Sequence, residues 1–255
     1  MLDSAVCESD AKDARRAPSI LPLSVDGLVY EHAGVRIIDN ISLHIEAAGC
    51  TAIMGYNGAG KSVLVRLLHG LLTPSAGACR WAGNFDANEI ARRQAMVFQA
   101  PVLLRRSVAA NVEYALRIRG FNGERRAQRL EAILQETDLL SLRDRPAAVL
   151  SAGERQRVAL CRALAIEPEI VFLDEPTASL DPAATVAIER ILARAMRAGR
   201  KLVMVSQSVG QVQRLARDVI FVHRGRVTEH TPIEEFSTQP RSEPARAFVA
   251  GELFE

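Results

Sequence analysis

The sequence predicts an α/β fold in which helices cover a mainly parallel sheet. Short apolar runs alternate with stretches of helical periodicity, which is typical of parallel strands joined by crossover helices. A run that is apolar at every position also favours a strand buried on both faces. The expected strands begin near Leu23 and continue at residues 35–45, 51–54, 170–173, 202–205 and 219–222.

A long interval between these strands carries no strand signal. Residues 107–119, 123–136 and 151–165 each have helical periodicity. They predict a helical subdomain, at about residues 100–165, inserted into the α/β core. The segment from residue 231 onward predicts short helices that close the domain.

The ends of the chain set the expected domain limits. Residues 1–18 are polar and charged without periodicity, which predicts a disordered tail and leaves residues 19–255 as one domain. No apolar run approaches the roughly 20 residues that span a bilayer. Asp3 and Glu8 stand where a signal peptide needs an apolar core, so we expect the chain to stay in the cytosol.

Composition excludes several classes of protein. The 255 residues are 48% hydrophobic, and 32 Lys and Arg against 30 Asp and Glu give a net charge of +2. Such a balance supplies no strong field for nucleic acid, so we expect no nucleic-acid partner. The four cysteines lack C-x-x-C spacing, so neither a zinc site nor a disulfide framework is expected.

A glycine-rich loop follows the strand expected at residues 51–54. Residues 55–62 read Gly-Tyr-Asn-Gly-Ala-Gly-Lys-Ser and precede a helix, which is the context that a phosphate-binding loop requires. Backbone N–H groups of such a loop surround a β-phosphate, its lysine reaches the β- and γ-oxygens, and its hydroxyl ligates magnesium. Val63 adds no second hydroxyl. The candidate nucleotide contacts are Gly55, Asn57, Gly58, Ala59, Gly60, Lys61, Ser62 and Val63.

Two acids end the apolar run at residues 170–173. Asp174 and Glu175 precede a proline, so they emerge at the carboxyl edge of the sheet, where open α/β sheets bind ligands. Asp174 is the candidate magnesium ligand, and Glu175 is the candidate general base that activates water. The alternative is a pair of solvated turn acids.

A helix start lies about twenty residues before these acids. Residues 150–156 read Leu-Ser-Ala-Gly-Glu-Arg-Gln, in which Ser151 is a natural N-cap. A capped helix start also attracts anions, although an N-cap alone is the simpler interpretation.

Together these segments resemble the ATPase subunit of an ABC transporter. Residues 55–62 resemble the Walker A motif, and residues 150–156 resemble the LSGGQ-like signature. The strand that ends at Asp174 resembles the Walker B motif, and residues 179–181 resemble the D-loop. The resemblance covers nearly everything after residue 20. It implies a P-loop NTPase (RecA-like) core with a mainly parallel sheet, an antiparallel β part near the N-terminus, and an inserted helical subdomain. It also implies ATP and Mg2+ as cofactors.

The resemblance assigns further roles. It implies a homodimer in the ATP-bound state, in which Ser151 and Gly153 of one chain contact the γ-phosphate held by the other chain. Gln99 resembles the Q-loop glutamine that senses γ-phosphate and magnesium. Tyr30 resembles the aromatic residue that stacks on adenine; the alternative is an aromatic side chain that packs on the core.

Two positions depart from the family pattern. Ala152 replaces the first glycine of the signature, a small change. Gln207 stands where the family places a histidine after the strand at residues 202–205. Its amide can donate a hydrogen bond to the γ-phosphate but cannot become cationic, so hydrolysis is expected to be slower or to depend differently on pH. The alternative is that Gln207 is an equivalent neutral donor.

The resemblance also indicates the kind of transporter. One free-standing ATPase domain favours an importer, and residues 95–107 are similar to those of tungstate-type oxyanion importer ATPases. The implied partners are integral membrane permease subunits and, indirectly, an extracytoplasmic solute-binding protein. The chain would lie peripherally on the cytoplasmic face of the cell membrane. Residues 101–106 are expected to help form the groove for a permease helix. Phosphate, molybdate or amino-acid import, or a soluble role without transport, are the alternatives.

Overall fold

The computed structural model describes residues 18–252 and residue 254. The tail expected over residues 1–18 therefore lies outside the described residues except for Pro18. The strands in chain order are β1 (Leu23–His32), β2 (Val35–Ile45), β3 (Cys50–Met54), β4 (Ala76–Trp81), β5 (Gln94–Val97), β6 (Ile170–Asp174), β7 (Lys201–Val205), β8 (Asp218–His223) and β9 (Arg226–Pro232).

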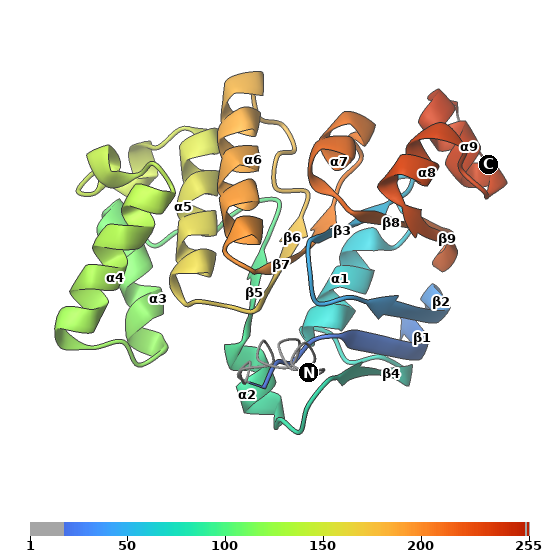
Figure 1. Ribbon diagram of the computed structural model, residues 1–255, viewed down its shortest axis with the longest axis horizontal. Coiled ribbons are helices and arrows are strands. Elements are labelled where there is room, and N and C mark those ends of the chain that lie inside the picture. Colours follow the sequence, from blue (N-terminus) through green and yellow to red (C-terminus); the bar gives the residue numbers. More distant parts are fainter. Residues whose placement is uncertain (1–17, 253, 255) are drawn as a thin grey trace, which may run out of the picture.

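Helices connect and cover these strands (Figure 1). In chain order they are α1 (Lys61–His69), α2 (Ala87–Arg92), α3 (Val108–Ile118), α4 (Gly123–Glu136), α5 (Ala152–Ala165), α6 (Pro182–Arg197), α7 (Val209–Leu215), α8 (Ile233–Thr238) and α9 (Glu243–Ala250). Two short 3-10 turns, Leu140–Leu142 and Ala147–Val149, lie between α4 and α5. In the part of the chain that the structure describes, none of the helices combines the length and the apolar character of a bilayer-spanning segment.

A six-stranded sheet forms the centre of the core, in the order β5-β6-β7-β3-β8-β9. All neighbouring pairs are parallel except β8 and β9. A separate antiparallel sheet has the order β2-β1-β4. The predicted α/β class, with a mainly parallel sheet and an antiparallel part near the N-terminus, is confirmed.

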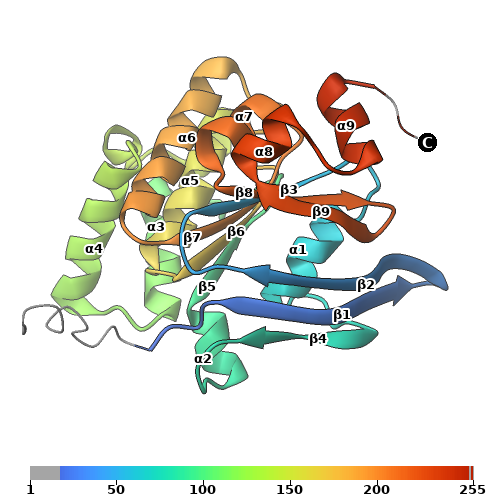
Figure 2. The same ribbon diagram turned by 45° about the vertical axis from the view of Figure 1, so that its right-hand side comes forward.

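The central strands are buried on both faces. Every residue of β3, β6 and β7 is buried. Because side chains alternate along a strand, Ala52 and Met54 belong to the hydrophobic cluster that contains residues of α3 to α8, whereas Ile53 belongs to the cluster that contains residues of α1. Helix α1 lies between the six-stranded sheet and the antiparallel sheet (Figure 2).

Helices α3, α4 and α5 form the predicted insertion between β5 and β6, on the left of Figure 1. Their observed bounds agree closely with the helical periodicity of the sequence. Ser107 and Ser151 cap α3 and α5 by accepting a hydrogen bond from the third following N–H group.

Strand β4, helix α2 and strand β9 show no apolar pattern in the sequence, and none of the three was predicted. Strand β4 contains no buried residue, and α2 has no buried face. Strand β9 ends at Pro232, so it includes residues 231 and 232, with which the closing helices were predicted to begin; its buried side chains are the polar Glu229 and Thr231. The short helices α8 and α9 do follow it.

Candidate active site

The phosphate-binding loop joins β3 to α1, as the motif requires. A Cβ atom on Gly55 would lie 2.1 Å from the carbonyl oxygen of Val222, so this position needs glycine for backbone contact with β8. Gly60 has a φ of 100° and begins α1 without a side-chain cap. The first turn of α1 also carries no acidic residue. Its N–H groups and partial positive charge are therefore available to an anion.

Lys61 is folded back onto the loop. Its Nζ atom donates hydrogen bonds to the carbonyl oxygens of Gly55 and Tyr56, each at 2.8 Å, and the residue is only 6% exposed. Burial lowers the pKa of Lys61, while the charges of Glu175 and Asp174 oppose that shift. The two carboxylates therefore offset part of the cost of burying the charged form of Lys61.

The two expected magnesium ligands are in contact. Ser62 Oγ donates a 2.7 Å hydrogen bond to Asp174 Oδ1, and Asp174 is 3% exposed at the end of β6. A hydroxyl and a carboxylate are hard oxygen ligands of the kind that Mg2+ prefers, and the ion usually completes its shell with waters and substrate phosphates. The residues present therefore fit a magnesium ion bound together with a nucleotide.

Arg66 is a neighbour that the sequence analysis missed. One turn after Ser62 on α1, its Nη2 atom lies 3.6 Å from Asp174 Oδ2, and its buried Nε atom has no hydrogen-bond partner. The signal that could have found it is the i, i+4 spacing from Ser62, which places both side chains on one helix face.

Glu175 and Gln207 form a direct pair. The Gln207 amide nitrogen donates a 2.6 Å hydrogen bond to Glu175 Oε1. Parallel pairing of β6 and β7, with Asp174 opposite Val205, brings both side chains to the same sheet edge. Glu175 has a φ of 47°, in the left-handed region that non-glycine residues rarely occupy. Such strain is typical of functional sites, and it accompanies a carboxylate that Gln207 orients.

Gln99 lies at the same edge of the sheet. It follows β5, whose last residue Val97 pairs with Leu173 of β6, and its side chain is exposed. The preceding Phe98 carbonyl accepts a 3.4 Å hydrogen bond from Gln156 of α5. The segment that carries Gln99 is thus connected to the helical subdomain.

The signature segment begins α5. Ser151 and Glu154 form a reciprocal capping box, with hydrogen bonds of 3.2 and 2.7 Å. The N–H group of Ser151 is the main cause that lowers the pKa of Glu154. A Cβ atom on Gly153 would lie 2.6 Å from the Cβ atom of Ala184. Packing of α5 against α6 within one chain therefore already requires this glycine.

Tyr30 has a neighbouring ring that the sequence analysis did not consider. Tyr30 is half-buried in β1, and His32 lies parallel to it, with 6.5 Å between ring centroids and 5° between planes. The signal was the spacing of two residues along a strand, which puts both rings on one face. His32 is therefore a second candidate for the adenine-stacking surface.

A phosphate-binding loop, a buried acid next to its serine, and an oriented glutamate at one sheet edge define a P-loop nucleotide hydrolase. A family model described as ABC transporter matches residues 38–178. The chain belongs to the ABC transporter family, as an ATP-binding subunit of importer type. It is an ATP hydrolase coupled to transmembrane transport.

Individual relatives agree with that membership. The tungstate uptake system ATP-binding protein TupC of Peptoclostridium acidaminophilum is 36% identical over 210 residues, which cover 82% of this chain and 98% of TupC. The phosphate import ATP-binding protein PstB 2 of Natronomonas pharaonis is 33% identical over 91% of this chain and 87% of its own length. The solved structure of CbiO1 from Clostridium perfringens, part of the ABC transporter complex CbiONQ, has a TM-score of 0.78 at 28% identity. That match covers 88% of this chain and 93% of CbiO1.

The role assigned to Glu175 predicts a separation of binding from turnover. Glu175→Gln keeps an oxygen that can accept the Gln207 hydrogen bond but removes the base, so hydrolysis should fall by roughly 10²–10⁴-fold. ATP affinity should stay within about a factor of two, the size of one weak contact. Steady-state hydrolysis and titration with a fluorescent ATP analogue measure both. Glu234→Gln, an exposed carboxyl on α8, is the control, and wild-type turnover in Glu175→Gln would exclude Glu175 as the base.

Gln207 leads to a pH-dependent prediction. Gln207→His should raise turnover rather than ATP affinity, because an imidazolium makes charge-assisted hydrogen bonds roughly twice as strong as those of an amide. The gain should grow as pH falls through about 6.5, where imidazole becomes cationic. Gln207→Ala should lower turnover at every pH, since it removes the donor. Rates from mildly acidic to mildly basic pH test this; three coincident profiles would show that Gln207 does not act on the γ-phosphate.

Proposed function

We propose that this chain energises the import of an oxyanion such as tungstate. It acts as a homodimer on the cytoplasmic face of the cell membrane, bound to integral permease subunits, while an extracytoplasmic solute-binding protein selects the cargo. Similarity to TupC, nearly the whole of which is matched, supports the cargo. Phosphate is the first alternative, because PstB 2 is named for phosphate import.

A groove between the core and the helical subdomain supports the permease contact. It has a volume of about 380 Å³ and is lined by residues from α1, α2, β5, α3 and α5. Four large apolar side chains in its lining are unusually exposed for such residues: Leu71 (50%), Phe98 (42%), Tyr114 (40%) and Ile118 (65%). Contiguous exposed apolar surface of this kind marks an interaction site. The lining reaches Phe98 but includes none of residues 101–106.

The polar groups of this groove indicate what binds there. Arg119 and Arg162 line it, no carboxylate does, and burial lowers the pKa of both arginines. Burial and Arg119 also lower the pKa of His69 to about 4, so this imidazole is neutral at pH 7. Gln94 is 4% exposed, and its Oε1 atom has no hydrogen-bond partner. The complementary partner is an amphipathic permease helix with apolar side chains, a carboxylate and a hydrogen-bond donor.

The groove borders the segment that carries Gln99. Phe98 lines the groove and is adjacent to Gln99, and its carbonyl oxygen accepts the hydrogen bond from Gln156 of α5. A helix that presses into the groove therefore acts on the segment that carries the candidate γ-phosphate sensor. This connection favours a transport role over a soluble ATPase without a membrane partner.

Variants of the groove test the permease contact. The tagged wild-type chain should co-purify with permease subunits from native membranes. Ile118→Asp and Arg162→Glu should each reduce the recovery of those subunits at least about tenfold. Ile118→Asp puts an unpaired charge into a desolvated contact, and Arg162→Glu puts a carboxylate opposite the expected carboxylate of the permease helix. Arg190→Glu, an exposed arginine on α6, is the matched control. Equal recovery in all four samples would place the permease contact elsewhere.

The recovered complex also tests the cargo. With its solute-binding protein present, tungstate should stimulate ATP hydrolysis and raise the melting temperature of the binding protein, because a ligand stabilises the state that binds it. Molybdate, phosphate, sulfate and an amino-acid mixture are the comparison samples. A response to phosphate or to amino acids alone would replace tungstate as the cargo without affecting the assignment of the ATPase.

The homodimer predicts complementation between two inactive chains. Ser151→Arg blocks a site through the partner chain, and Lys61→Ala disables the chain's own loop. A heterodimer of the two therefore has one doubly damaged and one intact site. Random 1:1 mixing should restore up to about a quarter of wild-type activity, since half of the dimers are mixed and each has one intact site of two. Lesions that act within each chain would give no recovery.

A further inference from the structure

Tyr56 is the second residue of the phosphate-binding loop, at a position that the motif leaves open. Its side chain turns away from the loop and packs against the core with the C-terminal helix. The Tyr56 ring meets Phe248 of α9 edge-on, with 5.1 Å between centroids. Phe221 and His223 of β8 lie at 6.4 and 6.3 Å, also edge-on. Three rings therefore contact this half-buried side chain.

The hydroxyl group of Tyr56 is also fixed. It donates a 2.9 Å hydrogen bond to the carbonyl oxygen of Glu252. This hydrogen bond depends on Gly251, which ends α9 in the left-handed conformation, with a φ of 77°, and reverses the direction of the chain. The N–H group of Glu252 then bonds to the Ala247 carbonyl at 2.8 Å, which holds the turn that brings its own carbonyl oxygen to Tyr56.

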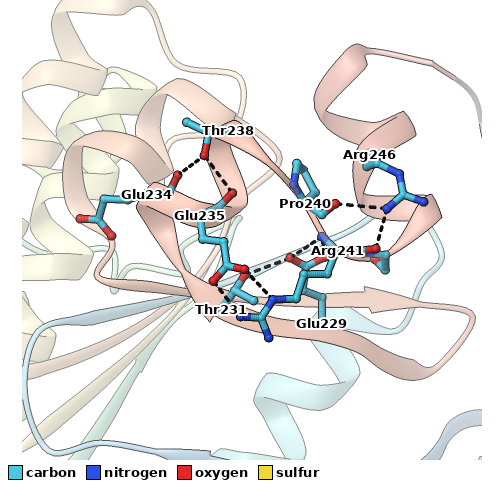
Figure 3. A network of polar contacts seen from close by, with 9 residues as sticks. Glu229, Thr231, Glu234, Glu235, Thr238, Pro240, Arg241 and Arg246 are labelled. Atoms are coloured by element: carbon cyan, nitrogen blue, oxygen red, sulfur yellow. Dashed lines mark hydrogen bonds and ion pairs between the residues drawn. The ribbon is translucent and has the colours of Figure 1, made fainter.

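Helix α9 is itself held firmly by β9 and α8 (Figure 3). The buried Glu229 carboxylate accepts hydrogen bonds from the backbone N–H groups of Arg241 and Ser242, all at 3.0 Å. The Arg241 guanidinium donates to both oxygens of Glu235, at 2.6 and 2.8 Å. The connection into α9 is thus held by contacts that do not involve Tyr56.

The other side of Tyr56 belongs to the phosphate site. Its carbonyl oxygen is one of the two acceptors for Lys61 Nζ, at 2.8 Å, and it also accepts a 3.2 Å hydrogen bond from the Ala59 N–H group. Tyr56 therefore joins the C-terminal helix directly to the backbone that positions Lys61.

We propose that Tyr56, held by the Phe248 ring and the Glu252 carbonyl oxygen, positions the phosphate-binding loop for ATP. Tyr56 is a positioning residue, because its side chain acts through the loop backbone and Lys61 rather than by contact with the nucleotide. The inference rests on the assignment of residues 55–62 as the ATP site. Loosening this support should weaken the hold on the phosphates while leaving Glu175 and the chemical step unchanged.

The test compares Tyr56→Phe, which removes only the hydroxyl, with Tyr56→Ala and Phe248→Ala. Each should raise the KM for ATP and the Kd for a fluorescent ATP analogue by roughly two- to tenfold, the range that one hydrogen bond or one aromatic contact is worth. The kcat should stay within about twofold of wild type, as expected when binding alone is lost. The double variant Tyr56→Ala with Phe248→Ala should have the same KM for ATP as Tyr56→Ala alone, because both substitutions remove the same ring contact.

The controls separate this role from the alternatives. Glu243→Gln, an exposed residue of α9, should leave KM unchanged. A merely structural contact would lower the melting temperature of Phe248→Ala without changing KM, and a direct contact of Tyr56 with ATP would leave Phe248→Ala at the wild-type KM. Either result overturns the inference, as would a fall in kcat alone. Failure of the wild-type chain to bind ATP would instead overturn the assignment of the nucleotide site.

Discussion

The complete burial of the central parallel strands is the constraint on which the rest of the molecule depends. Strands β3, β6 and β7 expose neither face, so their side chains are almost entirely apolar and their backbone groups bond to neighbouring strands. Polar chemistry is therefore confined to the strand ends. Because these strands run parallel, the segments that follow Met54, Leu173 and Val205 meet at one edge of the sheet. The position of the site follows from the topology.

The polar groups at that edge are paired with one another. Lys61 binds loop carbonyls, Ser62 binds Asp174, and Gln207 binds Glu175. All three groups of contacts lie at the edge where a phosphate and its magnesium ion would bind. Nucleotide bound at this edge would exchange one set of short hydrogen bonds for another. Preorganisation of this kind keeps the cost of reorganisation low.

Sequence reasoning succeeded where burial imposes a pattern. The fully apolar run ending at Asp174 and the serine cap of α5 could be placed from the sequence alone, because core packing and unpaired helix N–H groups restrict the residues allowed there. Strand β9 could not, since its inward residues are polar and depend on loop N–H groups far along the chain. The same limit applies within the site. The contact of Gln207 with Glu175 and the support of Tyr56 by Glu252 join residues that no local pattern relates.

The close packing of Gly153 on Ala184 has a mechanical consequence. Helix α6 starts at the end of the loop that begins with Glu175, and α5 starts at Ala152, directly after its cap Ser151. Because Gly153 has no Cβ atom, the first turns of these helices are in close contact. In the proposed homodimer, Glu175 would face the chain's own nucleotide, and Ser151 would face the nucleotide of the partner chain. A displacement of either helix start on hydrolysis at one site would then be passed to the other site, so the two nucleotide sites of the dimer would act together rather than independently.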